Sequence, residues 1–443
     1  MSTGMRRGLA WAFVILFLIS APVVVLYTAG YRLNLPSGRL VQTGILSISS
    51  VPSGARVLVD GVLSGTTSAL VKNLLPGSHR VELRKDGYLP WSKTLPIESQ
   101  RTTFVQNAVL NADKPAVLQR AASAGAGAFA RATGNAAYVR QGKVWNEIWS
   151  YQPQDGGDRL VARRPSSDGM PALAWSPDGT TLAISTGSGP SRSVSLVNVD
   201  DGRRFDLPAK SGTPAGWDAG TGAAYLLSAK DGISSADVDG DVVSIAPSPA
   251  LALETSADGS YAIVAAEGER LAVVHRQANG VSLVGYVPMG NYRFAPAPDG
   301  WLALDDADRQ SLIVLDGNGS GAAVLTANAS QWQWEPKGRR LLYTDGHELH
   351  LFDPLGGGDE TLTRVSDPIT GIAWRVGLDA ALYAQGAQLV SIEFDRRDGR
   401  ETATLAQGNG FQSLWTDPSG KTAFTFGSLD GGKTSGLISR GLE

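Results

Sequence analysis

The chain contains no cysteine among its 443 residues. It therefore has no disulfide, no nucleophilic thiol, no zinc site built on thiolates and no cysteine for a lipoprotein anchor. It also has only four histidines and no Gly-x-Ser-x-Gly sequence, the serine-hydrolase motif. Charged side chains make up 18% of the residues, and the net charge is −3. Because an excess of basic side chains is missing, nothing supports nucleic-acid binding.

Glycine, by contrast, is abundant, with 53 residues, which is typical of an all-β protein with many turns. The exception to this character is residues 9–29, which are almost wholly apolar and uncharged. As a helix, this stretch is roughly 31 Å long, enough to cross a bilayer core. Arg6 and Arg7 precede it. We therefore expect residues 1–32 to form a cytoplasmic tip and a transmembrane signal anchor, with the N-terminus inside.

A cleaved signal peptide is the alternative interpretation of this stretch. Thr28-Ala29-Gly30 is the only triplet there with small residues at the two positions that matter for cleavage. The apolar stretch is also longer than a signal peptide needs. We favour an uncleaved anchor, which makes the cytoplasmic membrane a partner and places the C-terminal domains outside the cytoplasm.

Residues 44–112 have the pattern of a compact β module. Apolar residues alternate with polar ones in three short stretches, residues 46–48, 55–59 and 81–84. Asp60-Gly61 supplies residues that tolerate the left-handed conformations of a tight hairpin. The alternation and the turn together predict half-buried strands joined by hairpins.

The motifs of this module resemble those of the PEGA domain. They are Val51-Pro52-Ser53-Gly54-Ala55-Arg56-Val57-Leu58-Val59-Asp60-Gly61, Gly65-Thr66-Thr67, Leu75-Pro76-Gly77-Ser78-His79-Arg80-Val81-Glu82-Leu83 and Gly87-Tyr88. Two positions depart from the family's pattern: Ser53 replaces the name-giving Glu, and Ser68 replaces the usual Pro. The resemblance implies a small β-sandwich of bacterial and archaeal surface proteins, without catalytic residues, that acts as a binding or spacer module.

The same module is basic. Eight basic and five acidic side chains between Arg39 and Asp113 give it a net charge of +3. We favour a solvated strand face for these basic residues. Contact with anionic lipid headgroups is the alternative, because each nearby Lys or Arg contributes about 1 kcal/mol to such binding.

Residues 113–128 are expected to contain a closing strand and a linker. Ala116-Val117-Leu118-Gln119 has the composition of a spare strand. Residues 121–128 consist only of alanine, serine and glycine, which is typical of a linker or a loose loop.

A repeat of about 41 residues fills residues 129–443. Its clearest copy is Trp175-Ser176-Pro177-Asp178-Gly179, which follows a short apolar strand and precedes an alternating one. We place the units near Ala130, Trp175, Trp217, Thr255, Pro296, Trp334, Trp374 and Thr416. A repeat of this length made only of strands predicts the four-stranded blades of a β-propeller.

We expect eight blades, or seven if the weak unit near Ala130 is not a blade. The last unit offers only three strands, at about Gln412–Thr416, Thr422–Phe426 and Ser435–Ser439. The spare strand at residues 116–119 is expected to pair at the outer edge of that blade and close the ring. The predicted fold class is all-β apart from one N-terminal transmembrane helix, with a small β-sandwich followed by a β-propeller.

The repeats resemble TolB-like and WD-repeat-like bacterial propellers, chiefly through Trp175-Ser176-Pro177-Asp178-Gly179 and its variants. This resemblance implies the fold and a tendency to bind proteins rather than a reaction. The order of anchor, PEGA module and propeller is similar to that of PEGA-domain proteins of small-genome bacteria.

Tryptophan recurs at the end of the first strand of a unit, at Trp175, Trp217, Trp334, Trp374 and Trp415. These rings could line a channel and stack on sugars or peptides. The same spacing is what packing between blades requires, and we favour packing. Trp301 and Trp332 fall outside this register and are better candidates for an exposed contact.

Two acidic clusters have a composition that could form a calcium site. Asp237-Val238-Asp239-Gly240-Asp241 lacks the glycine that an EF-hand needs after its fifth position, where Val242 stands, so we favour a hairpin turn. Asp305-Asp306-Ala307-Asp308 is expected to be a charged turn before a strand at Leu312–Leu315, with a loose calcium site as the alternative.

His347 and His350 are the closest histidine pair. Three residues apart on an expected strand, their rings lie on opposite faces, which is poor geometry for one metal ion. We therefore expect no metal site there.

These patterns assign no catalytic, cofactor-binding or metal-binding residue. We expect a membrane-anchored cell-envelope protein, not an enzyme, whose outward-facing propeller binds a protein or glycan at the ring's axis, with the PEGA module as a spacer. The alternative is an enzyme that modifies an envelope polymer, with its site at the propeller axis. Acids clustered at a central cleft would favour the enzyme, whereas a polar face would favour binding.

Overall fold

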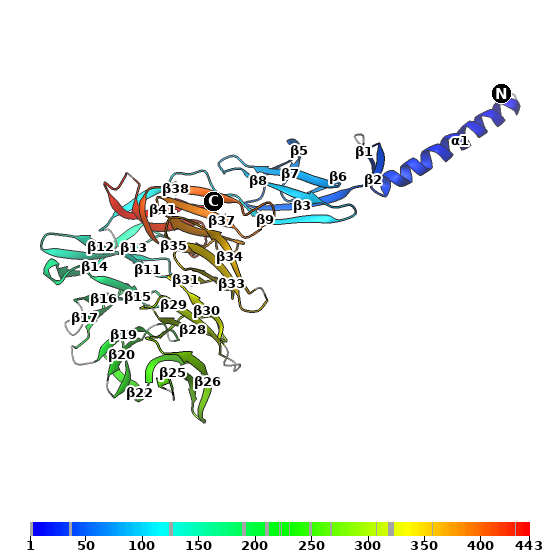
Figure 1. The fold of residues 1–443 in the computed structure, drawn as a ribbon. Helices are drawn as coiled ribbons and strands as arrows, with labels where there is room; N and C mark the ends of the chain where they lie inside the picture. Colours follow the sequence, from blue (N-terminus) through cyan, green and yellow to red (C-terminus); the bar gives the residue numbers. More distant parts are fainter. Residues whose placement is uncertain are drawn as a thin grey trace. The chain divides into compact units, whose positions relative to one another are not determined.

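A computed structural model describes residues 3–34, 38–123, 127–187, 192–208, 212–220, 222, 224–229, 231–247, 250–265, 268–306, 308–317, 323–356, 358–429 and 431–443. The chain divides into two compact units. Unit 1 comprises residues 1–114 with 393–403 and 443, and unit 2 comprises residues 115–392 with 404–442. Figure 1 labels many of the strands of both units.

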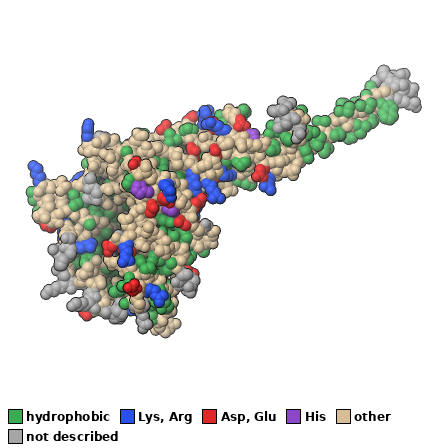
Figure 2. Space-filling view, viewed as in Figure 1, with side chains coloured by type: hydrophobic (Ala, Val, Ile, Leu, Met, Phe, Trp, Pro, Cys, Tyr) green, Lys and Arg blue, Asp and Glu red, His purple; other side chains and the backbone are tan. Residues whose placement is uncertain are grey.

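The apolar N-terminal stretch forms helix α1 (Thr3–Thr28). Its residues Gly8–Thr28 are long and apolar enough to cross a membrane, by length and composition, and their most apolar window is not buried within the protein. Apolar side chains cover this helix in Figure 2. The predicted span ended one residue too late, at Ala29. The helix stops earlier because Gly30 adopts a left-handed φ of 84°, which terminates helices.

A short hairpin that the sequence did not predict follows the helix. It pairs β1 (Tyr31–Asn34) with β2 (Arg39–Gln42). The Arg32 guanidinium lies 3.6 Å from the centroid of the Tyr27 ring and donates to the Tyr27 carbonyl at 2.9 Å. The Gly30 carbonyl accepts from the backbone N–H and the hydroxyl of Thr43, at 3.0 and 2.9 Å. These bonds tie the end of the helix to the start of the β module.

Two sheets form the β module, with the orders β6-β3-β9 and β5-β4-β7-β8. The strands are β3 (Gly44–Val51), β4 (Arg56–Val59), β5 (Val62–Thr66), β6 (Ala69–Leu74), β7 (Gly77–Arg84), β8 (Trp91–Ile97) and β9 (Thr102–Val109). The predicted hairpin at Asp60-Gly61 is confirmed, since both residues have positive φ and join β4 to β5. Alternate residues of β3, including Leu46 and Ile48, are buried in a core shared by both sheets. Each such side chain contributes about 1.5–3 kcal/mol by burial.

Lys93, one of the eight basic residues expected on a solvated face, is instead buried. In unit 1 its Nζ lies 3.6 Å from Glu393 Oε1 and donates to the carbonyls of Asp395 and Gly399, at 2.5 and 3.0 Å. Trp91 Nε1 donates to Glu393 Oε2 at 2.7 Å. The inward register of β8, where alternate residues are buried, puts Lys93 on the same face as Trp91 and Leu95. A buried ammonium requires such partners, so the solvated-face prediction was wrong for this residue.

Unit 2 is a β-propeller built from four-stranded antiparallel sheets, and the described residues form eight of them. In chain order the first seven are β11–β14 (Gly127–Phe129, Ala136–Gln141, Trp145–Gln152, Gly157–Pro165), β15–β18 (Ala172–Trp175, Thr181–Thr186, Ser193–Asn198, Arg204–Asp206), β19–β22 (Thr213–Trp217, Tyr225–Ala229, Gly232–Ala236, Val242–Pro247), β23–β26 (Ala250–Ser256, Gly259–Ala265, Arg270–Gln277, Gly280–Pro288), β27–β30 (Arg293–Ala295, Trp301–Asp306, Ser311–Asp316, Ala323–Asn328), β31–β34 (Gln331–Trp334, Leu341–Thr344, Glu348–Asp353, Gly358–Arg364) and β35–β38 (Ile369–Trp374, Ala380–Gln385, Gln388–Glu393, Thr402–Gln407). The weak unit near Ala130 is thus a complete sheet. That all eight sheets stand as blades of one closed ring stays a prediction.

The last sheet has the order β10-β41-β40-β39. Its strands are β10 (Val117–Ala121), β39 (Asn409–Thr416), β40 (Thr422–Ser428) and β41 (Ser435–Gly441). The predicted closing strand therefore pairs with the end of the chain, and Val117 faces Ser439 in antiparallel register. This pairing supplies the fourth strand that the last unit lacked and covers the edge of β41.

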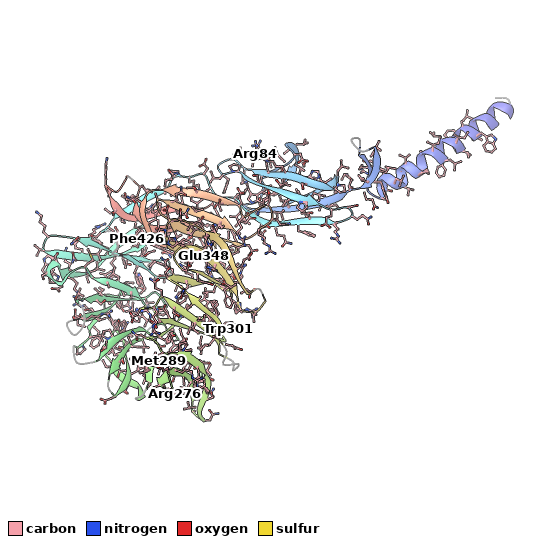
Figure 3. All side chains as sticks on the ribbon, viewed as in Figure 1. Arg84, Arg276, Met289, Trp301, Glu348 and Phe426 are labelled. Carbon is pink, nitrogen blue, oxygen red and sulfur yellow. The ribbon has the colours of Figure 1, made fainter. Side chains whose placement is uncertain are left out.

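The predicted linker at residues 121–128 was too long. Ala121 belongs to β10, and Gly127 and Ala128 belong to β11; residues 124–126 of the predicted linker lie outside the described residues. A Cβ at Gly127 would lie 2.3 Å from the ring of Phe426, which is labelled in Figure 3. The small residues at this end of the stretch serve close packing rather than flexibility.

The recurrent tryptophans pack between neighbouring sheets, which confirms the packing interpretation. The indole N–H groups of Trp175, Trp217 and Trp374 donate to the carbonyls of Ala128, Ala174 and Gln333, at 3.3, 3.1 and 3.0 Å. Each acceptor lies on the first strand of the preceding sheet. These indole N–H groups therefore satisfy carbonyls of edge strands that would otherwise lack a hydrogen-bond partner.

Candidate functional site

An inner cavity lies among the first strands of five sheets in unit 2. Its volume is about 540 Å³, within the roughly 300–1,000 Å³ typical of ligand sites. Strands β11, β27, β31, β35 and β39 supply most of its wall. The wall carries the charged residues Arg131, Arg293 and Asp305 and the aromatic residues Phe129 and Trp332.

Arg131 contributes a positive charge to the cavity. Its Nη2 donates to the Trp332 carbonyl at 3.2 Å, and its guanidinium carbon lies 5.8 Å from the centroid of the Trp332 ring. Within the described part of the chain, no carboxylate forms an ion pair with it. The Arg131 side chain is exposed to solvent at the cavity, and the protein atoms packed around it lower its pKa to about 10. It therefore remains charged at neutral pH.

Arg293 and Asp305 form an ion pair on the same wall. They are cross-strand neighbours on β27 and β28. The Arg293 Nη2 and Nε atoms donate to Asp305 Oδ2 at 2.7 and 2.9 Å. Because these two charges offset each other, Arg131 is the one uncompensated charge among the described residues that line the cavity.

Gln333 holds three of the first strands together. From β31, its Nε2 donates to the Ile372 carbonyl on β35 at 2.6 Å and to the Leu414 carbonyl on β39 at 3.3 Å. Its own carbonyl accepts from Trp374. Gln310 and Gln331, by contrast, line the cavity with side-chain amides that have no hydrogen-bond partner among the described residues. The wall is thus rigid in one part and offers free amide groups in another.

One face of each aromatic ring in the cavity wall is already covered by another side chain. Phe129 stacks on Trp415, with centroids 4.6 Å apart, and Trp332 lies beside the Arg131 guanidinium. Trp332 was one of the two tryptophans expected to make an exposed contact, and the structure places it in the cavity wall. The other, Trp301, starts β28 and is half-buried against the core around Ala295 and Leu325 (Figure 3).

Sequence reasoning missed Arg131. It matches no motif, and the structure was needed to bring it to Trp332, which is distant in sequence. One signal was available, because Arg131 lies two residues after the first strand of the first repeat, where inner residues of a propeller approach the axis.

The first acidic cluster forms a turn, as predicted. Residues 237–241 connect β21 to β22, and Ala236 faces Val242 in antiparallel register. Asp237 Oδ1 accepts from the backbone N–H groups of Asp239 and Asp241, at 2.9 and 3.3 Å. That carboxylate therefore stabilises the turn itself.

The second acidic cluster was only partly a turn. Asp305 and Asp306 belong to strand β28, and Ala307 lies outside the described residues. Asp306 is fully buried, and its Oδ2 accepts from the Asn291 backbone N–H at 3.1 Å. A buried carboxylate requires such donors, which explains why it ends a strand rather than standing in solvent.

The two histidines do not share a strand. His347 lies in the bend before β33, whereas His350 lies on β33 and stacks on Tyr343 with centroids 4.6 Å apart. Its Nε2 lies 3.3 Å from Glu348, which Figure 3 labels. Among the described residues, no group of three or more His, Cys, Asp or Glu side chains is arranged to hold a metal ion.

Comparison with solved structures gives similarities of fold. The crystal structure of the mitotic checkpoint complex contains a chain 13% identical, covering 74% of this chain and 92% of that chain, with a TM-score of 0.45. The C-terminal WD40 domain of Sif2 is 12% identical, covering 74% of this chain and 98% of that chain, with a TM-score of 0.48. No curated protein shows significant sequence similarity to this chain.

Comparison with protein families concerns the β module of unit 1. This module has two sheets and a hairpin at Asp60-Gly61, as expected for a small β-sandwich. Residues 43–111 match the PEGA domain, and this part of the chain is therefore a PEGA domain.

Proposed function

We propose that this chain is a membrane-anchored cell-envelope protein whose propeller binds a protein or glycan partner at the inner cavity. The observation that carries the proposal is the cavity itself, which combines a rigid wall with an arginine that lacks an acidic partner. Because Arg131 has no acidic partner among the described residues, a ligand that supplies a carboxylate can form an ion pair with it without displacing one.

Helix α1 supports the membrane anchor. It is apolar, its most apolar window is not buried, and Arg6 and Arg7 precede it. This arrangement favours a cytoplasmic N-terminus, with the PEGA domain as a spacer outside. We favour an uncleaved anchor over a signal peptide cut near Gly30, because the apolar stretch is longer than a signal peptide needs.

This topology has a direct test. A periplasmic reporter enzyme fused after Glu443 should be active, and the same reporter fused before Met1 should be inactive. Activity of the N-terminal fusion alone would show that the orientation is reversed.

The cavity wall also bears on the enzyme alternative. Glycosidases need two carboxylates that flank the reacting bond. Asp305 is the one acid among the described residues that line the cavity, and Arg293 pairs with it. This arrangement supports binding rather than polymer hydrolysis.

Site-specific photocrosslinking tests the binding function. A photoreactive amino acid at Gln331 places the probe in the cavity without breaking a described hydrogen bond. The matched control is the same probe at Arg339, which is exposed in the turn after β31. We expect a discrete adduct in the native envelope from position 331 and none from position 339. Equal adducts from both positions, or none, would contradict binding at the cavity.

A further inference from the structure

The residues that line the inner cavity have a net positive charge, whereas the chain from Lys114 onward has a net negative charge. From Lys114 onward the chain has 28 basic and 37 acidic side chains, a net charge of −9. The cavity wall instead carries two arginines and one aspartate. A positive recess in an acidic surrounding attracts anions to itself in preference to the outer surface.

The Arg131 side chain is held by contacts with Trp332, but most of its N–H groups have no acceptor among the described residues. Of the five N–H donors of a guanidinium, the described contacts use one, on Nη2, which bonds to the Trp332 carbonyl. The contact with the Trp332 ring limits the rotamers of the side chain further. A restrained guanidinium with unused donors is suited to a planar, two-oxygen anion, which it can bind through two parallel hydrogen bonds.

We propose that Arg131 binds a carboxylate of an acidic peptide segment of the partner, and that Gln310 and Gln331 bind the peptide groups beside it. This inference rests on the proposed function, since it identifies the ligand of the same cavity. Side-chain amides offer both a donor and an acceptor, which is what the C=O and N–H groups of a peptide require.

A peptide fits the wall better than an acidic glycan does. Sugar rings bind proteins largely by stacking on aromatic faces. One face of Phe129 is covered by Trp415, and Trp332 is engaged by Arg131. The side-chain amides of Gln310 and Gln331 remain free to bind a ligand in the same cavity.

The test uses the full chain in detergent or nanodiscs, applied to an array of random hexapeptides with Glu, Gln or Arg fixed at the third position. We expect the wild-type protein to retain Glu peptides at least tenfold more than Gln peptides. Arg131→Gln should abolish this preference, and Arg131→Lys should restore part of it. The matched control Arg339→Gln removes the same charge from an exposed turn without a described partner, and it should leave the preference unchanged.

Several results would overturn the inference. They are the absence of a Glu preference in the wild type, its persistence in Arg131→Gln, or its loss in Arg339→Gln. Oligogalacturonate and inorganic phosphate are added as competitors, and displacement of Glu peptides by either at lower concentration than free peptide would assign the cavity to that anion instead. If Arg131→Gln fails to fold, Arg131→Lys provides the comparison: it should weaken the Glu preference, and an unchanged preference would overturn the inference.

The outcome is separable from that of the proposed function. A crosslinked partner at position 331 whose capture is unaffected by Arg131→Gln would retain the binding function and reject the carboxylate assignment. A Glu preference without any crosslinked partner would retain the chemistry of the cavity and reject the envelope partner.

Discussion

The ring of Phe129 stacks on the ring of Trp415, with centroids 4.6 Å apart and planes 2° from parallel. Phe129 ends the first strand of the first propeller sheet, and Trp415 lies on the first strand of the last. The contact therefore joins the two ends of the repeat array on the inner side, while β10 and β41 join them on the outer side.

Removing Trp415 should weaken this junction. Its ring is 2% exposed and contacts Phe424 and Phe426 as well as Phe129. We expect Trp415→Ala to lower the free energy of unfolding by about 3–5 kcal/mol, as for other buried aromatic side chains. Urea unfolding followed by circular dichroism measures it. The control, Trp301→Ala at a half-buried site, should cost clearly less, and equal losses would contradict a special role for the junction.

Adding volume at the same junction should also destabilise it. A Cβ at Gly127 would meet the Phe426 ring at 2.3 Å, so Gly127→Val forces the ring to move, at a cost of about 1–3 kcal/mol. A second change, Phe426→Leu, should recover part of that loss, and the double-mutant cycle measures the coupling. Gly356→Val, where a Cβ meets nothing within 4 Å, is the control. Additive effects of the first two changes would contradict the contact.

These two residues show what sequence patterns can and cannot predict. The Pro-Asp-Gly turns and the alternating strands are local features, so the sheets and the closing strand followed from the sequence. The role of Gly127 depends on Phe426, almost three hundred residues away, and a run of small residues is equally typical of a linker. The contact that distinguishes the two interpretations is not local.

The same reasoning applies to Arg131 and Lys93. Arg131 is a candidate binding residue because it contacts Trp332 and has no acidic partner among the described residues. No sequence motif indicates either property. Lys93 was more predictable, because the two-residue period of its strand aligns it with Trp91 and Leu95. The prediction failed because it used the net charge of the whole module and not the position of Lys93 on its strand.

Lys93 gives a prediction for unit 1. Lys93→Ala leaves the Glu393 carboxylate buried without its counter-ion, which typically costs about 3–5 kcal/mol. Combining Lys93→Met with Glu393→Gln should recover most of that loss, because it removes both charges. Thermal unfolding of the full chain measures both variants. Lys72→Ala, at an exposed site, should change little, and a similarly small effect of Lys93→Ala would refute the buried ion pair.

The raised pKa of Glu254 leads us to expect that the free energy of unfolding depends on pH. Burial, with a smaller contribution from Asp218, raises the pKa of Glu254 from 4.5 to about 8. Between these values the unfolded chain has released a proton that the folded chain retains, so stability falls as the pH rises from 4.5 to 8 and is unaffected by this group outside that window. The slope is at most about 1.4 kcal/mol per pH unit.

Glu254→Gln should flatten this part of the profile. Urea midpoints of the wild type and the variant, measured from pH 5 to pH 9, give the difference between the two profiles. We expect the variant to gain stability relative to the wild type as the pH rises towards 8. Parallel profiles would show that Glu254 ionises normally in the folded protein.

Hydrogen–deuterium exchange with the partner captured through position 331 tests the central claim, that the inner cavity is the binding site, most directly. We predict that binding protects the backbone amides of Phe129, Arg131, residues 329–333 and residues 413–414, which line the cavity. The competing surface is the outer strand β26, where Val281, Leu283 and Tyr286 are exposed. Protection confined to residues 280–288, with the cavity wall unchanged, would contradict the account.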